Sequence, residues 1–148
     1  MKLITDSRES NPLEFIETDG VEFVTQALPV GDYSAEGQNV VIERKSVADL
    51  FGSFSSNYEA ERNKIIKAQV REIKFILAIE ASASDIRKGH SYWKDGEMHE
   101  HRKSGLSQIR QLMTIQRKYD IMVWFCDGRK DMAFRIMEYF LAGERLKK

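Results

Sequence analysis

The chain has 148 residues, of which 42% are hydrophobic and 31% are charged, and its 23 basic residues balance its 23 acidic residues. This length fits one domain, residues 1–148, with a core that needs neither disulfides nor a structural metal. The apolar runs are too short to cross a bilayer, and the zero net charge argues against a protein that coats nucleic acid by bulk electrostatics.

Four strands are predicted near the start of the chain, and the last of them carries a charged end. They are Leu3–Asp6, Val21–Leu28, a short strand around Asp32–Ser34, and a strand that begins at Val40 and reaches Lys45. Side chains alternate along a strand, so Glu43 and Lys45 are expected on the same face as Val41. Arg44 is expected on the other face.

Helices and buried strands follow in the rest of the chain. We expect a short helix Val47–Phe51 capped by Ser46, a helix from about Tyr58 to Arg71, a strand Phe75–Ile79, a helix capped by Ser104 or Ser107, a strand Ile121–Cys126 and a helix from about Lys130 to Leu141. Residues 82–103 are polar and mixed in charge, and we predict one long loop there.

The charged end of the fourth strand indicates chemistry rather than structure. A strand interior removes water from ions, and apolar neighbours cannot compensate for that loss. Asp32, separated from Glu43 by ten residues, supplies a second carboxylate from a neighbouring segment. Two carboxylates beside Lys45 are the minimum that holds a hard divalent cation and directs a water at a phosphodiester. The alternative is an exposed edge strand with an ordinary surface ion pair.

The same residues form a longer pattern, which runs Gly31-Asp32, ten residues, Glu43-Arg44-Lys45, three residues, Asp49. It resembles the signature of the XPF-type nuclease domain, which the archaeal Hef protein and the eukaryotic XPF endonucleases share. Asp6-Ser7-Arg8-Glu9 resembles the family's Asp-x-Arg-Glu segment, and Ile76–Glu80 resembles the strand after the signature. The resemblance implies an α/β, restriction-endonuclease-like fold, with a central mixed β-sheet flanked by helices. It also implies metal-dependent cleavage of DNA, at branches or flaps.

The resemblance assigns roles residue by residue. Asp32 and Glu43 are expected to bind Mg²⁺ or Mn²⁺, with Asp6 as a further acid, and Lys45 to position or activate water. The supporting residues are Arg8, Glu9, Arg44 and Asp49. Of these, the two arginines are expected to orient the acids or to contact phosphate. Simpler alternatives are a turn acid for Asp6 and a solvated helix side chain for Asp49.

The predicted loop is a second candidate for DNA contact, through phosphate binding and stacking of bases on Trp93. Its acidic residues dilute the positive charge, so a solvated loop without a role is the alternative. The residues assigned to DNA binding, one of them outside the loop, are Arg62, Lys88, Lys94, Arg102 and Lys103. A zinc site at His99 and His101 is disfavoured, because a structural site needs four ligands.

The chain also departs from the family pattern. Family members typically continue into tandem helix-hairpin-helix motifs, and we expect neither these nor a helicase domain in residues 1–148, which leaves branch selectivity open. Ser56-Asn57-Tyr58 stands where the family often has Gly-Arg-Leu, and Arg62 is the nearest substitute for that arginine. Homodimerisation through the nuclease domain stays open, since family members dimerise and the last helix has a wide apolar surface.

Other functions remain as alternatives. One is a catalytically weak DNA-binding or dimerisation module of the same family, and another is a different nuclease of this fold, such as a junction resolvase or a restriction-like enzyme. A third is an interaction domain that binds no nucleic acid. The single Cys126 and the absence of an export signal at the start of the sequence predict an intracellular protein, in the cytoplasm or associated with the nucleoid.

Overall fold

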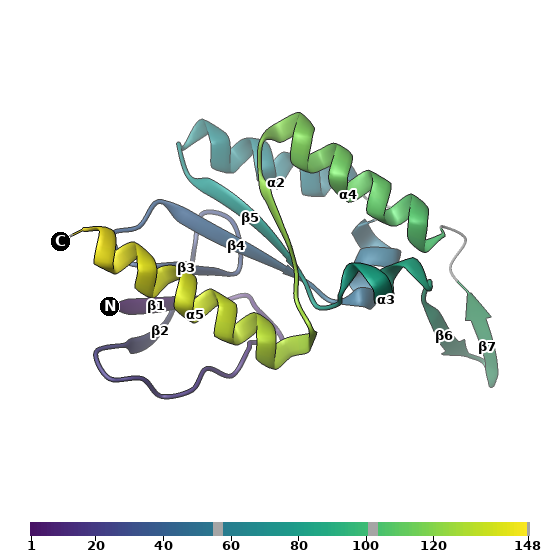
Figure 1. Cartoon of the computed structure of the whole chain (residues 1–148), viewed down its shortest axis with the longest axis horizontal. Coiled ribbons are helices and arrows are strands. Elements are labelled where there is room, and N and C mark those ends of the chain that lie inside the picture. The colour runs from purple at the N-terminus through teal and green to yellow at the C-terminus, as the bar shows by residue number, and fades with distance from the viewer. Residues whose placement is uncertain (55–57, 101–103, 148) are drawn as a thin grey trace.

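A six-stranded mixed sheet forms the centre of the molecule (Figure 1). The computed structural model describes residues 1–54, 58–100 and 104–147. In spatial order the strands are β2 (Glu22–Gln26), β1 (Lys2–Asp6), β3 (Tyr33–Ala35), β4 (Val40–Lys45), β5 (Lys74–Ile79) and β8 (Met122–Phe125). β3 is antiparallel to both of its neighbours, and the other neighbouring strands pair in parallel. The carboxyl ends of all strands except β3 therefore lie at one edge of the sheet.

Helices cover both faces of this sheet, and each face has its own apolar core (Figure 1). The long helices are α2 (Tyr58–Val70) and α4 (Gly105–Tyr119) on one face and α5 (Gly128–Leu146) on the other. Val41 of β4 packs in the core beneath α2 and α4, whereas the next residue, Ile42, packs in the core beneath α5. This alternation confirms the expected strand geometry.

The expected order of the main strands and helices is confirmed, with changes at the boundaries. β2 is shorter than predicted, and α5 extends further in both directions. The short helix after β4 is α1 (Val47–Asp49), which begins at the expected cap Ser46 and continues as the π-helix η1 (Leu50–Phe54). No helix in the described part of the chain combines the length and the apolar character needed to cross a bilayer.

The prediction of one long loop at residues 82–103 is wrong. Ser82 caps a short helix, α3 (Ala83–Arg87), whose Ile86 is fully buried. A hairpin of β6 (Ser91–Lys94) and β7 (Glu97–Glu100) then projects from the body of the molecule (Figure 1). Asp95 and Gly96 join its strands, and both have positive φ, as a tight two-residue hairpin turn requires. The polar composition concealed a hairpin because both of its strands are largely exposed.

Candidate active site

The site lies at the edge of the sheet where the parallel strands end. β1 ends at Asp6 and β4 ends at Lys45, while the turn before β3 brings Asp32 between them. The amide of Asp6 donates to the carbonyl of Asp32 at 2.8 Å, and the amide of Asp32 donates to the carbonyl of Ile42 at 2.9 Å. Three segments that are distant in the sequence are thereby fixed side by side.

Gly31 is required for this arrangement. Its φ is +83°, and a Cβ atom added to it would lie 2.8 Å from Cβ of Val41. Any larger residue would therefore combine an unfavourable backbone conformation with a steric clash against β4. The Gly31-Asp32 pair of the sequence pattern thus has a physical reason, because the glycine allows the turn that presents the acid.

A pocket of about 340 Å³ opens at this edge. Its lining residues are Asp6, Arg8, Pro29, Val30, Gly31, Asp32, Glu43, Lys64 and Lys67. The two carboxylates expected to bind a metal, those of Asp32 and Glu43, therefore share one pocket. Lys45 is not among the lining residues, since its side chain is directed toward Glu61 of α2.

Asp32 and Glu43 are close enough to influence each other's charge. Burial, together with the negative charge of Glu43, raises the pKa of Asp32 to about 7. One oxygen of Asp32, Oδ2, accepts a hydrogen bond from the amide of Arg44 at 2.8 Å. Glu43 is 4% exposed, and its Oε1 accepts from Nζ of Lys64 at 3.0 Å. Two carboxylates that repel each other in a partly dry pocket form a site that favours a cation.

Lys45 lies next to Glu43 but has a different main partner. Its Nζ donates to Oε1 of Glu61 at 2.6 Å and lies 3.7 Å from Oε1 of Glu43. The side chains of all three residues are almost completely buried. Glu61 therefore holds the ammonium of Lys45 in a fixed place beside the proposed metal ligand.

The sequence analysis missed Glu61 and Lys64, which α2 places over the end of β4. Lys64 bridges Glu43, at 3.0 Å, and Glu61, at 3.5 Å. Burial favours a lower pKa for Lys64, but the charges of Glu43 and Glu61 outweigh it and raise that pKa. The one sequence signal was the spacing of three residues, which puts both side chains on the same helix face. Charged residues on a helix usually indicate a solvent-facing surface, so this signal is weak.

Asp6 lines the pocket, but both of its oxygens already have partners. Arg8 donates to Oδ2 through Nε at 3.0 Å and to Oδ1 through Nη2 at 3.1 Å, and the amide of Leu28 donates to Oδ1 at 2.8 Å. Burial opposes the effect, but these hydrogen bonds lower the pKa of Asp6. Among the described residues, no three His, Cys, Asp or Glu side chains are arranged to hold a metal. Asp6 is thus not brought together with Asp32 and Glu43 as a third ligand.

Arg44 points to the opposite face of the sheet, where it forms a buried ion-pair network. Its guanidinium donates to both oxygens of Glu9 at 3.2 Å and to Oε1 of Glu80 at 2.7 Å. Arg129 of α5 also donates to Glu80, at 3.1 Å. Burial opposes the effect, but the hydrogen bonds to Glu9 and Glu80 raise the pKa of Arg44. In this position Arg44 can orient Asp32 through its backbone, whereas its side chain lies away from the pocket.

The remaining assigned residues that the structure describes lie outside this pocket. Asp49 and Ser46 form a reciprocal capping box at the start of α1, in which the amide of Asp49 donates to Oγ of Ser46 at 3.1 Å. Arg62 lies on α2, and Lys94 lies on β6. Lys88, which directly follows α3, pairs with Asp85 of that helix. Arg102 and Lys103 lie outside the described residues. The structure does not bring the assigned DNA-binding residues that it describes to the carboxylate pair.

The carboxylate oxygens at the pocket are suitable ligands for a hard divalent cation. Oδ1 of Asp32 and Oε2 of Glu43 accept no hydrogen bond from the described part of the chain, so each carboxylate retains one oxygen for a ligand. Mg²⁺ takes oxygen ligands and keeps several of its waters when it binds to proteins. Two carboxylates are therefore a sufficient protein contribution, provided that substrate oxygens or waters complete the coordination.

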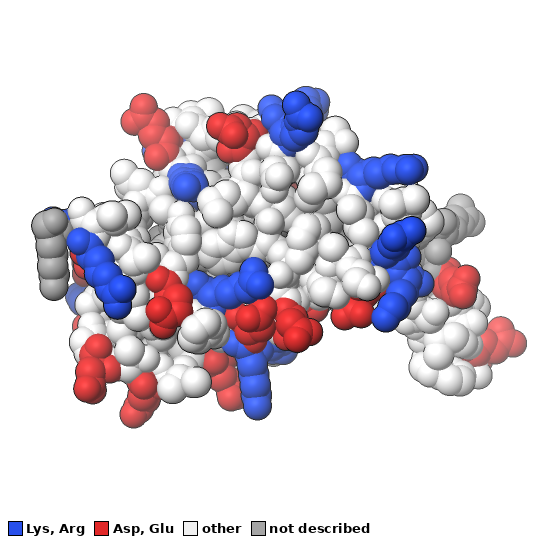
Figure 2. Space-filling view, in the orientation of Figure 1, with Lys and Arg blue, Asp and Glu red and all other residues white. Residues whose placement is uncertain are grey.

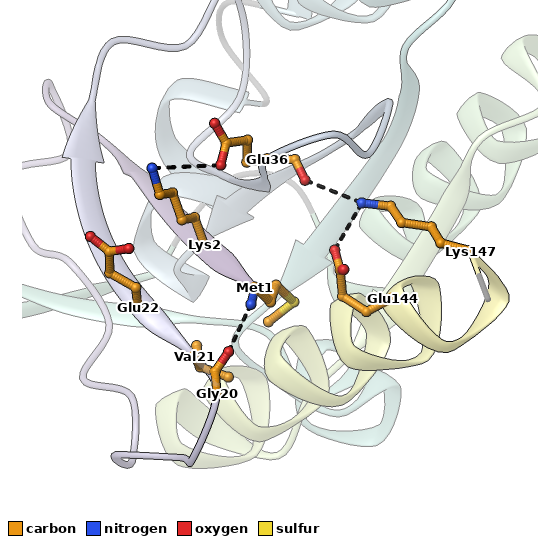
Figure 3. Close-up of a pocket in the computed structure, with 8 residues that line it drawn as sticks. All are labelled: Met1, Lys2, Gly20, Val21, Glu22, Glu36, Glu144 and Lys147. Atoms are coloured by element: carbon orange, nitrogen blue, oxygen red, sulfur yellow. Dashed lines mark hydrogen bonds and ion pairs between the residues drawn. The ribbon is translucent and has the colours of Figure 1, made fainter.

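A larger pocket, of about 640 Å³, lies at the other edge of the sheet, near the start of β1 (Figure 3). Lys2 pairs with Glu36 at 3.7 Å, and Lys147 pairs with Glu144 at 3.0 Å. Within each of these surface pairs, the positive and the negative charge neutralise each other. Its size therefore does not make it a better candidate than the smaller pocket of Asp32 and Glu43.

Comparison with known protein families gives a match that covers most of the chain. The family model of the ERCC4 domain matches residues 5–137. XPF from Aeropyrum pernix has a similar structure, with a TM-score of 0.64 and 18% identity, over 99% of this chain and 67% of that chain. XPF from Aeropyrum pernix in complex with DNA gives a TM-score of 0.66 and 17% identity, over 97% of this chain and 65% of that chain.

This chain therefore spans about two thirds of the length of each of these XPF chains. No curated protein matches it. The family match confirms the XPF-type resemblance, and the structural similarity confirms the restriction-endonuclease-like mixed sheet between helices.

Proposed function

Because this chain belongs to the ERCC4 domain family, we propose that it is a divalent-metal-dependent endonuclease that hydrolyses phosphodiester bonds in DNA, at branches or flaps. The observation that carries the proposal is the convergence of Asp32 and Glu43 in one pocket, with Lys64 in contact and Lys45 fixed nearby. That set of groups matches what hydrolysis of a phosphodiester needs, since both the nucleophile and the phosphate must be brought to one place.

Asp32 and Glu43 are the residues that would hold Mg²⁺ or Mn²⁺. When bound, such an ion polarises a phosphate oxygen and lowers the pKa of a coordinated water. The chain itself supplies the positive charge of Lys45, which Glu61 keeps beside Glu43. A fixed ammonium 3.7 Å from Glu43 adds positive charge next to the pocket, which favours the negative charge that develops in the transition state. Arg8 keeps Asp6 ionised but also cancels its charge, so the attraction for a cation comes from Asp32 and Glu43.

DNA as the substrate is supported by the similarity to XPF from Aeropyrum pernix, one structure of which is a complex with DNA. The preference for branches rests on the family resemblance alone. This chain spans about two thirds of that XPF chain, so the grip on a branched substrate belongs to the proposal and needs its own measurement.

The test is a cleavage assay with the purified chain on flap, fork and linear duplex DNA, in Mg²⁺ and in EDTA. We expect product only in Mg²⁺, and more from the branched substrates. Glu43→Gln and Lys45→Met should each slow cleavage at least about a hundredfold, because each removes a group that acts on the transition state.

Matched controls come from the surface pairs at the other edge of the sheet. Glu36→Gln and Lys147→Met make the same chemical changes at exposed ion pairs, and both should cleave like the unmodified chain. Turnover close to that of the unmodified chain in Lys45→Met would contradict the catalytic assignment. A mobility shift of the DNA without product in any metal would instead identify a binding module.

A further inference from the structure

Of the two lysines that pair with Glu43, Lys64 is the one that lines the pocket. Its side chain is 40% exposed and lines the pocket, whereas that of Lys45 is 8% exposed and does not. We propose that Lys64 is a built-in counter-cation of the Asp32–Glu43 pair, which competes with the divalent metal and, once displaced, contacts the phosphate of the substrate. This inference rests on the proposed function and adds a residue outside the charged signature of β4.

The first step of the argument is the position of the ammonium. Nζ of Lys64 lies 3.0 Å from Oε1 of Glu43, and Asp32 lines the same pocket as these two residues. An ammonium at this place offsets the repulsion between the two carboxylates. A divalent cation bound to the same carboxylates would provide this neutralisation itself, so the two cations repel each other and compete for the site.

The second step is the freedom of Lys64 to leave. Four methylene groups carry its ammonium, and in the described part of the chain only the carboxylates of Glu43 and Glu61 hold it. Glu61 has a closer partner in Lys45, at 2.6 Å, and Glu43 keeps Lys45 at 3.7 Å, so neither buried acid loses every cation when Lys64 moves. Lys45 remains in place during that movement, because Glu61 keeps its shorter ion pair with it.

The third step is the destination of the displaced ammonium. The pocket that Lys64 lines is also lined by Arg8 and Lys67, so a phosphate that enters it to reach Asp32 and Glu43 comes close to these cations. A lysine in this position can pair with a phosphate oxygen as a mobile point charge. Lys64 then adds to the binding of the transition state after having weakened the binding of the metal.

The experiment measures Mn²⁺ binding without DNA, by calorimetry and by the paramagnetic resonance signal of free Mn²⁺. Lys64→Met should lower the Kd for Mn²⁺ about tenfold, because it removes a competing charge from the site. Lys67→Met is the matched control, since this lysine lines the same pocket from the next helical turn without an ion pair to either carboxylate among the described residues. It should change the Kd less than about threefold, as expected for a more distant, screened charge.

Cleavage at saturating Mn²⁺ provides the second measurement. We expect Lys64→Met to bind the metal more tightly and yet cleave about tenfold more slowly, because a contact to the phosphate is lost. Opposite effects on metal affinity and on cleavage are not expected from a merely structural residue. Lys64→Arg keeps the charge and should retain the original Kd for Mn²⁺. Lys64→Gln removes the charge and takes the place of Lys64→Met if that variant fails to fold.

The outcomes separate this inference from the proposed function. If the unmodified chain binds no Mn²⁺, the metal-dependent function itself is overturned. If it binds Mn²⁺ and Lys64→Met binds it with the same or lower affinity, the function stands and the competition is overturned. If Lys64→Met cleaves as fast as the unmodified chain at saturating metal, the contact of Lys64 with phosphate is overturned.

Discussion

Burial and repulsion from Glu43 destabilise the ionised form of Asp32. Its carboxyl group is largely buried and faces a second carboxylate, and its pKa rises from the ordinary 3.8 to about 7. The folded protein therefore keeps a proton on Asp32 that the unfolded chain releases at a lower pH. Stability from this group is fully present below about pH 4 and is lost as the pH rises toward 7.

We therefore expect Asp32→Asn to stabilise the metal-free protein at pH 8. The amide cannot ionise, and its oxygen can still accept the hydrogen bond from the amide of Arg44. The free energy of unfolding should increase by about 2 kcal/mol at pH 8 and by much less at pH 4.5. Urea unfolding in EDTA at both pH values measures it, with the exposed Asp19→Asn as the control. An equal change in the free energy of unfolding at both pH values would contradict the proposed repulsion between Asp32 and Glu43.

Strand geometry explains why the meeting of Asp32 and Glu43 could be anticipated from the sequence. A glycine turn and a charged strand end are local features, and the paired strands place both at one edge of the sheet. The involvement of Glu61 and Lys64 could not be anticipated in this way. It depends on how α2 is rotated against β4, which the packing of Ile65 and Ala68 in the core determines. The sequence of α2 indicates that rotation poorly, because its apolar residues are not concentrated on one face.

Among the secondary-structure elements, α5 is connected by Arg129 to the edge of the sheet at which Asp32 and Glu43 lie. One side of its guanidinium donates to Glu80, which follows β5, and the other donates to the carbonyls of Asn11 at 3.1 Å and Pro12 at 2.9 Å. Glu80 also accepts from Arg44, whose amide binds Asp32. The start of α5, the end of β5 and the segment after β1 are thus linked in one network behind the site.

Loss of this link should destabilise the fold more than loss of an ordinary surface pair. We expect Arg129→Ala to lower the free energy of unfolding by about 1–2 kcal/mol, since several partly buried hydrogen bonds are lost together. The matched control is Arg135→Ala on the same helix, where the exposed pair with Asp131 should contribute less than about 0.5 kcal/mol. Urea midpoints of the two variants provide the comparison, and equal midpoints would mean that the network does not stabilise the fold.

The secondary-structure elements differ in how well the sequence predicts them, and burial is the reason. β5 is apolar at almost every position because it is buried on both faces, so it is apparent from its composition. The hairpin of β6 and β7 has no buried position, and Trp93 on it is 70% exposed. With no hydrophobic face to produce a periodic pattern, only the turn Asp95-Gly96 identifies it. The sequence therefore reveals buried elements better than exposed ones.

At the scale of the whole molecule, charge is balanced both in number and in distribution. Figure 2 shows basic and acidic side chains interspersed over the visible face, and the net charge is zero. The net charge of the molecule therefore does not favour DNA, and the DNA binding that we propose would depend on the local cations at the pocket. Three basic side chains line it, those of Arg8, Lys64 and Lys67.

This distribution predicts a shallow dependence of DNA binding on salt. Each neutralised phosphate changes the slope of log K against log salt by about −0.9, so three contacts give a slope of about −3. Lys67→Met should reduce the slope by about one. Lys147→Met should leave it unchanged, because Lys147 pairs with Glu144 at the opposite edge of the sheet. Fluorescence anisotropy in Ca²⁺, over a range of KCl concentrations, measures these slopes. A much steeper slope, or an equal effect of both variants, would mean that DNA contacts a broader surface than the pocket.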